Sequence, residues 1–325
     1  MLKIGITIGD PAGVGPELII KLLDHVDPKK AYIIYGERKI LESAKKLLEK
    51  DINMKEIHTT DEVKVPGIYI ADLDISETDR PMPSLTSGKV AIAYLGRAVV
   101  DAVIGNIHGL LTMPINKFWA KLAGFSYEGQ TEFLAQASNV REYAMLMYSE
   151  KIKVVLLSTH LPLKVAIEKV SRESVKGKVE LAHREFKRLF GYEPSIGVVG
   201  LNPHAGEMGQ IGREDVEEIL PAIEELKGKG IKVEGPLSPD SAFLKTDAFD
   251  VFLCMYHDQG LIPFKLLAFR DGVNLTLGIP FVRTSPDHGT AYDIAWKGIV
   301  DMSSALHALR LCEKLVERIT SFPAF

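Results

Sequence analysis

Several residue types and patterns are scarce in this sequence, and each shortage excludes a class of protein. Only two cysteines occur in 325 residues, which excludes a disulfide-rich secreted fold and favours a reducing, cytoplasmic location. No apolar run is long enough to span a bilayer, so we expect no membrane partner. Acidic and basic residues are interspersed with a net charge of −4, which indicates no nucleic-acid partner. Because Met1 runs directly into a strand-like segment, we expect no signal peptide.

The sequence also lacks the fingerprint of dinucleotide-binding Rossmann domains. Its first strand-like segment, residues 2–8, ends in the loop GDPAGVGPE, which does not have the spacing G-x-G-x-x-G. Pro16 in this loop suits the first position of a helix. Such a glycine-rich loop either places backbone N–H groups against a phosphate or is only a tight turn. The sequence leaves both interpretations open.

Apolar runs and amphipathic helix patterns alternate throughout the chain, which predicts an α/β fold with a largely parallel sheet. The length and the 46% hydrophobic content suit a large core divided between two lobes. Among the expected elements are a strand over residues 102–111, helices over residues 172–190 and 213–226, and a helix opened by residues 286–293.

Three of the apolar runs are followed by a histidine at the same end. These histidines are His160, His204 and His257. The carboxyl ends of parallel strands lie side by side and form the ligand sites of α/β sheets, so we expect the three imidazoles to converge. Three neutral imidazoles can hold a divalent metal ion with positions left open for a substrate. Three independent structural histidines are the alternative, which the threefold repetition of the pattern makes less favoured.

Further polar residues accompany these histidines. Asp258 follows His257 directly, and Asp240 is the free carboxylate of the loop GPLSPDSAF. Lys265 and Arg283, with Asn274 between them in the chain, suit the binding of a phosphate or carboxylate. Taken singly, each basic residue is better explained by a solvated surface position.

Eight motifs, in order along nearly the whole chain, carry a resemblance to a known family. They are TIGDPAGVGPE, TMPINK, GQTEFLA, STHLPL, NPHAGEMGQIGRE, GPLSPDSAF, YHDQGLIPFK and RTSPDHGTAYDIA. Together they resemble the PdxA family, the 4-hydroxythreonine-4-phosphate dehydrogenases of vitamin B6 (pyridoxine) biosynthesis. The segments GD…GVGPE and HGTA are also similar to the isocitrate and isopropylmalate dehydrogenases.

The resemblance implies a two-lobed αβα fold of the isocitrate and isopropylmalate dehydrogenase type, with the active site in the cleft between the lobes. Residues 1–130 with 276–325 would form the cofactor-side lobe, and residues 131–275 the lobe for metal, substrate and dimerisation. It also implies a homodimer whose active site lies at the subunit interface and draws ligands from both subunits.

The resemblance further implies roles for individual residues. The implied ligands of one divalent ion, which is zinc, magnesium or cobalt, are His160, His204 and His257. The implied substrate contacts are Gln130, Thr131, Lys265, Asn274 and Arg283, and the implied catalytic residues are Asp258, Asp240 and Lys265. The implied contacts to NAD are His288, Gly289, Thr290, Ala291 and Asp293.

The implied reaction is the NAD-dependent oxidation of 4-phosphohydroxy-L-threonine at its C3 hydroxyl, followed by decarboxylation to 3-amino-2-oxopropyl phosphate. One departure from the family pattern bears on the substrate, because Gln130 stands where the family usually has a histidine. Glutamine can donate a hydrogen bond to an anion, but it cannot add charge or carry a proton. A paralogous dehydrogenase of 4-phospho-D-threonate or 4-phospho-D-erythronate is therefore the alternative. A metal-dependent hydrolase and a non-catalytic phosphate-binding protein are less favoured.

Overall fold

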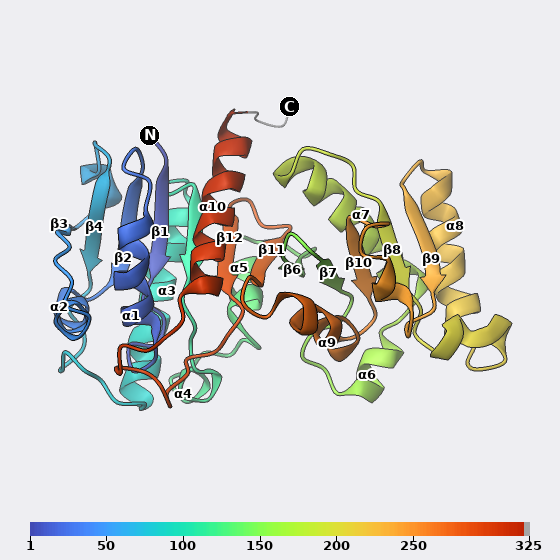
Figure 1. The fold of residues 1–325 in the computed structure, drawn as a ribbon, viewed down its shortest axis with the longest axis horizontal. Coiled ribbons are helices and arrows are strands. Elements are labelled where there is room, and N and C mark those ends of the chain that lie inside the picture. The colour runs from blue at the N-terminus through green and yellow to red at the C-terminus, as the bar shows by residue number, and fades with distance from the viewer. Residues whose placement is uncertain (322–325) are drawn as a thin grey trace. The chain divides into compact units, whose positions relative to one another are not determined.

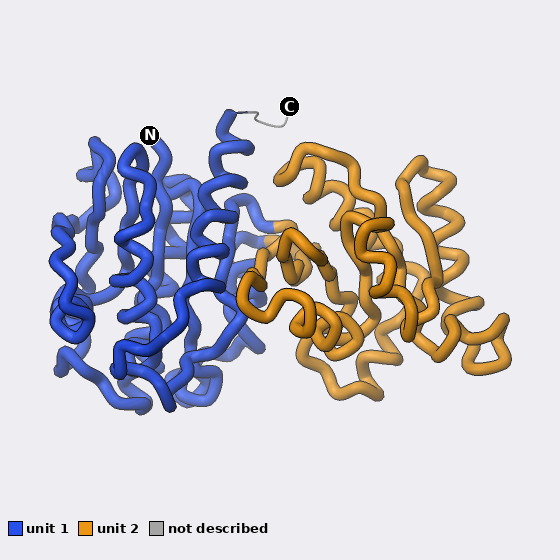
Figure 2. The backbone as a smooth tube through the Cα atoms, in the orientation of Figure 1, with its two compact units in different colours: residues 1–139, 279–321 blue, residues 140–278, 322–325 orange. Residues whose placement is uncertain are grey.

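The computed structural model describes residues 1–321, which divide into two compact units. Unit 1 comprises residues 1–139 and 279–321, and unit 2 comprises residues 140–278 (Figure 2). Each unit is a sheet covered by helices, so the predicted α/β class with mostly parallel strands is confirmed. Residues 322–325, which the expected first lobe included, lie outside the described residues. No helix within residues 1–321 has the length and apolar character needed to cross a membrane.

The strands of unit 1 pair in parallel in the order β3-β4-β2-β1-β5-β12 (Figure 1). Their bounds are Lys3–Thr7 (β1), Ala31–Gly36 (β2), Lys55–Ile57 (β3), Gly67–Asp72 (β4), Gly109–Thr112 (β5) and Val282–Pro286 (β12). The helices are Gly15–Leu22 (α1), Arg38–Leu47 (α2), Leu85–Val103 (α3), Lys117–Leu122 (α4), Gln130–Ala137 (α5) and Ser303–Ser321 (α10), with 3₁₀ turns at Leu23–His25 and Thr60–Glu62.

Both faces of the unit 1 sheet are covered, as the alternation of side chains along the strands requires. On one face, Leu110 packs with Leu95 and Ala98 of α3. On the other face, a Cβ at Gly109 would lie 2.7 Å from the Cys312 sulfur of α10, so helix and strand approach closely there. Strands buried on both faces explain the near-continuous apolar runs of the sequence.

The strands of unit 2 pair in the order β11-β6-β7-β10-β8-β9, and β6 is antiparallel to both of its neighbours. Their bounds are Ala144–Tyr148 (β6), Lys153–Leu156 (β7), Ile196–Val199 (β8), Val233–Leu237 (β9), Val251–Cys254 (β10) and Val273–Leu277 (β11). The helices are Leu163–Glu168 (α6), Arg172–Leu189 (α7), Leu220–Gly228 (α8) and His257–Ala268 (α9); shorter turns are Pro203–Gly209 (η3), the π-helical Asp215–Ile219 (η4) and Ala242–Lys245 (η5).

The strands β7, β10 and β8 are the part of unit 2 that positions the histidines. They are adjacent and parallel, and their side chains are buried. On one face Phe252 and Cys254 pack with Leu261 and Phe264 of α9. The carboxyl ends of these three strands therefore lie next to one another at one edge of the sheet.

Two expected elements are wrong. The strand expected over residues 102–111 begins only at Gly109, because α3 continues to Val103 and buries Ala102 in the core. The helix expected after residues 286–293 does not form, and the described chain makes turns there. Its backbone finds other partners, since the N–H groups of Trp296 and Gly298 donate to the buried Glu17 carboxylate. The helix over residues 172–190 is confirmed as α7, and the one over 213–226 begins as a π-helical turn before α8.

Candidate active site

Two of the three candidate metal ligands lie close together in unit 2. His160 follows β7 and His257 begins α9 after β10, and their ring centroids are 5.6 Å apart. The two segments are tied by the hydroxyl of Ser158, which donates to the carbonyl oxygen of Met255 at 2.9 Å. Neighbouring parallel strands thus deliver two imidazoles to one place, as the repeated sequence pattern predicts.

Two candidate ligands have a carboxylate on one ring nitrogen. His257 Nδ1 lies 2.7 Å from Asp258 Oδ1, and His204 Nδ1 lies 2.8 Å from Glu207 Oε1. Metal-binding histidines commonly have this arrangement, because a carboxylate on one nitrogen fixes the ring and leaves the other nitrogen for the ion. The donor set therefore suits a divalent ion that accepts imidazole nitrogen.

His204 lies in η3, and Asp240 is within electrostatic reach of it. The hydroxyl of Ser238 donates to Asp240 Oδ1 at 2.7 Å and lowers the pKa of that carboxyl. Among residues 1–321, however, no three His, Cys, Asp or Glu side chains of one chain stand together as a ligand group. The three-histidine site therefore stays a prediction.

In unit 1, the end of β5 holds two of the predicted substrate contacts. Arg283 on β12 is 2% exposed, and its Nε and Nη2 donate to Thr112 Oγ1 at 3.0 and 2.7 Å. Burial lowers the pKa of Arg283 to about 10, against the opposing attraction of Glu132, so the guanidinium keeps its charge at neutral pH. Gln130 Nε2 donates to the carbonyl oxygen of Met113, the next residue after Thr112, at 3.2 Å. Arg283 and Gln130 therefore donate hydrogen bonds to two consecutive residues, Thr112 and Met113.

The orientation of Gln130 follows from this bond. A carbonyl oxygen can only accept, so the amide nitrogen must face Met113. The other amide atom, Gln130 Oε1, is an acceptor that is buried without a hydrogen-bond partner. The sequence suggested that Gln130 donates a hydrogen bond to an anion. In this orientation one N–H of the amide is used by Met113, so only the second N–H could donate to an anion. The buried Oε1 could in addition accept a hydrogen bond from a substrate.

The other predicted substrate contacts are divided between the units. Thr131 follows Gln130 in the first turn of α5 in unit 1. Lys265 lies half-buried on α9, and Asn274 lies on β11, both in unit 2. Asn274 Nδ2 is 3.2 Å from the sulfur of Met145, and its Oδ1 is buried without a hydrogen-bond partner.

The predicted cofactor loop, residues 288–293, packs against the glycine-rich loop after β1. The N–H of Val14 donates to the Thr290 carbonyl at 3.0 Å, and a Cβ at Gly13 would lie 2.7 Å from that oxygen. Tyr292 donates to Asp10 Oδ2 at 2.5 Å, and burial raises the pKa of the Asp10 carboxyl. No sequence pattern assigned a role to Asp10 or Tyr292, although both lie inside the family motifs TIGDPAGVGPE and RTSPDHGTAYDIA.

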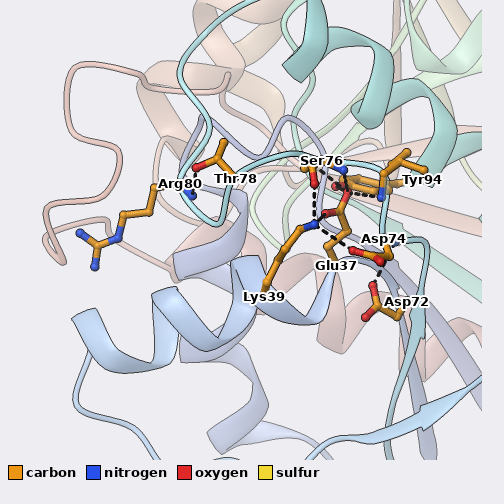
Figure 3. Close-up of polar contacts among 9 residues, drawn as sticks. Glu37, Lys39, Asp72, Asp74, Ser76, Thr78, Arg80 and Tyr94 are labelled. Carbon is orange, nitrogen blue, oxygen red and sulfur yellow. Dashed lines mark hydrogen bonds and ion pairs between the residues drawn. The ribbon is translucent and has the colours of Figure 1, made fainter.

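Glu37 is the centre of another polar cluster in unit 1, at the carboxyl ends of β2 and β4 (Figure 3). It is fully buried and its Oε1 accepts from the backbone and hydroxyl of Ser76, at 2.9 and 2.8 Å, and from Tyr94 at 2.8 Å. Lys39 pairs with Glu37 and with Asp74, at 3.5 and 2.8 Å. These bonds anchor the segment that follows β4, so we assign the cluster a structural role.

Comparisons with known proteins agree on one family. Residues 28–312 match PdxA, described as pyridoxal phosphate biosynthetic protein PdxA. A 4-hydroxythreonine-4-phosphate dehydrogenase from Aquifex aeolicus is 62% identical, over 98% of this chain and 99% of its own. A D-threonate 4-phosphate dehydrogenase from Pectobacterium atrosepticum is 39% identical, over 96% and 98%. The crystal structure of 4-hydroxythreonine-4-phosphate dehydrogenase from Klebsiella pneumoniae superposes with a TM-score of 0.84 at 35% identity, over 97% and 98%. The chain therefore belongs to the PdxA family.

Proposed function

We propose that this enzyme oxidises 4-phosphohydroxy-L-threonine at its C3 hydroxyl with NAD and a divalent metal ion, and that decarboxylation then yields 3-amino-2-oxopropyl phosphate for pyridoxal 5′-phosphate synthesis. The observation that carries the proposal is the 62% identity, over 98% of the chain, to a relative named for this activity. The relative named for D-threonate 4-phosphate is 39% identical. Oxidation of 4-phospho-D-threonate or 4-phospho-D-erythronate is the second candidate, because Gln130 replaces the usual histidine.

His160, His204 and His257 would hold the metal ion. The approach of His160 to His257 and the carboxylates on Nδ1 of His204 and His257 support this assignment. Imidazole ligands suit zinc or cobalt better than magnesium. When bound, such an ion supplies Lewis acidity that lowers the pKa of the substrate alcohol and stabilises negative charge formed during decarboxylation.

A homodimer would complete the ligand set, which no three side chains of a single chain supply within residues 1–321. The surface of α9 supports this proposal. Ile262 and Leu266 are 59 and 81% exposed at positions that share one face of the helix, and Phe269, directly after the helix, is 75% exposed. The same helix begins at His257 and carries Lys265. A second copy that covers this face would bring its own side chains beside a metal ligand and a substrate contact.

The chain's own residues would bind the substrate and move its protons. Arg283 and Lys265 would bind the phosphate by charge-assisted hydrogen bonds, and Gln130, Thr131 and Asn274 would contact the substrate as well. Asp258 or Asp240 would accept the proton of the C3 hydroxyl, while the hydride from C3 passes to NAD. The bond from C2 to the carboxylate carbon then breaks with loss of CO₂, and the electron pair stays on C2. Lys265 is the candidate donor of the proton that C2 then takes up.

Residues 288–293 would hold the NAD adenosine, beside the glycine-rich loop on which they pack. The bond from Val14 to the Thr290 carbonyl, and that from Tyr292 to Asp10, support this proposal because they fix the loop before any ligand binds. A nucleotide site built on two mutually anchored loops costs little ordering entropy when it is filled.

A substrate panel tests the proposed activity. The enzyme, a divalent metal salt and NAD are mixed with 4-phosphohydroxy-L-threonine, 4-phospho-D-threonate or 4-phospho-D-erythronate, and the absorbance of reduced nicotinamide is followed. We expect the highest kcat/KM with 4-phosphohydroxy-L-threonine. A preference for either sugar-acid phosphate would move the enzyme to the second candidate function. Phosphate release without reduction would indicate a hydrolase, and binding without turnover would indicate a non-catalytic protein.

A further inference from the structure

The segment that carries His204 has an unusual backbone. Residues 204–208 form a left-handed turn, with φ values of 53° at His204, 53° at Ala205, 45° at Glu207 and 56° at Met208. This conformation costs an L-residue about 1–2 kcal/mol, so four non-glycine residues within one five-residue turn do not adopt it by their own preference. The contacts around the turn must therefore hold it.

The carboxylate of Asp215 holds the residues that lead into the turn. Asp215 is fully buried at the start of η4. Its Oδ1 accepts from the N–H of Leu201 at 2.7 Å, and its Oδ2 accepts from the N–H and the side-chain amide of Asn202, at 3.0 and 2.9 Å. A Cβ at Gly200 would lie 2.7 Å from Asp215 Oδ1, so the backbone passes directly over the carboxylate. Asp215 thus fixes the path of the chain two residues before His204.

Gln259 connects this path to the segment of His257. Its side chain is buried, its Oε1 accepts from the N–H of Met255 at 2.7 Å, and its Nε2 donates to the carbonyl oxygen of Gly200 at 2.6 Å. Met255 precedes His257 by two residues, and Gly200 precedes His204 by four. One amide therefore joins the chain segments of two candidate metal ligands.

We propose that Asp215 and Gln259 are positioning residues for the metal site, which fix the chain segments that carry His204 and His257 without touching the ion. The inference rests on the proposed metal site, since its value to the protein is the fixed position of two candidate ligands. Replacement of buried polar groups that orient metal ligands without contacting the ion commonly lowers the metal affinity by about 10- to 100-fold. The sequence places Gln259 among the polar residues that follow the strand before His257, whereas no sequence pattern pointed to Asp215.

The chain offers a matched control for a purely structural role. Asp250 makes a similar clamp at the opposite ends of the same two strands, where its Oδ2 accepts from the N–H and hydroxyl of Ser195, both at 2.8 Å. Ser195 precedes β8 and Asp250 precedes β10. Asp250→Asn therefore weakens the same pair of strands at the end opposite to the histidines.

The experiment measures the affinity of the full-length enzyme for Co²⁺, by competition with a chromogenic chelator, together with the visible absorption of the bound ion. Asp215→Asn and Gln259→Met are expected to weaken Co²⁺ binding by about 10- to 100-fold and to alter its spectrum. Asp250→Asn is expected to lower the unfolding temperature but to bind Co²⁺ as the unaltered enzyme does. Gln259→Met serves alone if Asp215→Asn does not fold.

Inclusion of His204→Ala separates failure of this inference from failure of the proposed site. If His204→Ala binds Co²⁺ normally, the three-histidine site is wrong and the positioning role falls with it. If His204→Ala loses the ion while Asp215→Asn and Gln259→Met keep normal affinity, the site stands and the positioning role is overturned. Equal losses in Asp215→Asn and Asp250→Asn would also overturn it, because the effect would then reflect general destabilisation.

Discussion

Replacement of Arg283 by methionine tests the anion-binding corner of unit 1. The guanidinium is 2% exposed, and its Nε and Nη2 both donate to the Thr112 hydroxyl, which is a neutral acceptor. A buried cation is costly, and that cost is seen in the lowered pKa of Arg283, about 10. Hydrogen bonds from the guanidinium to an anionic substrate group would offset part of the free-energy cost of burying the charge.

The expected effect follows from the worth of such bonds. A hydrogen bond to a charged group contributes about 1.5–3 kcal/mol, so Arg283→Met should raise KM for the phosphorylated substrate by roughly 10- to 150-fold. Methionine has a similar length and no charge, so it fills most of the space of the arginine without adding a polar group. Affinity for NAD should stay nearly unchanged, because residues 288–293 are held by their own contacts to Asp10 and Val14.

Steady-state kinetics with varied substrate and a fluorescence titration with NADH measure the two affinities separately. Thr112→Val is the matched control, since it removes the acceptor of both Arg283 bonds but keeps the charge. It should raise KM less than Arg283→Met does. Loss of NAD binding with an unchanged KM would refute the assignment of Arg283 to the substrate.

Three further outcomes are expected. Since the charge of Arg283 is lost as pH rises through its pKa of about 10, kcat/KM should fall above that pH in the unaltered enzyme, and this step should be missing from the pH profile of Arg283→Met. Gln130→His should strengthen substrate binding on the acidic side and lose this effect as pH rises through the imidazole pKa, ~6.5 when unperturbed; a changed preference between 4-phosphohydroxy-L-threonine and 4-phospho-D-threonate at every pH would instead favour the paralogous activity. Leu266→Glu on the exposed face of α9 should shift the mass measured by light scattering towards a monomer, whereas Ile104→Glu, at an exposed site in unit 1, should leave it unchanged.

The sequence predicted most of the α/β pattern because buried parallel strands are read as apolar runs, as in β7 and β10. The helix expected after residues 286–293 was predicted wrongly. There the backbone N–H groups of Trp296 and Gly298 donate to the Glu17 carboxylate rather than to carbonyl oxygens within a helix. The pairing of His160 with His257 was predictable, because strand ends of one sheet are neighbours. The left-handed turn at His204 and its support by Asp215 were not, because they depend on contacts between residues 13 and 14 positions apart in the chain, which no periodicity encodes.

The order of the units along the chain has a consequence for synthesis on the ribosome. Unit 2 is one continuous segment, whereas unit 1 is interrupted after residue 139 and resumes at residue 279. Arg283 and the loop that bonds to Asp10 both belong to the resumed part, together with α10, which covers Gly109. A nascent chain that has emerged only to residue 278 can thus complete unit 2, while the unit 1 sheet still lacks β12 and α10. The anion-binding corner consequently forms last, and chains that terminate early should be prone to aggregate through the apolar surface that β12 and α10 otherwise cover.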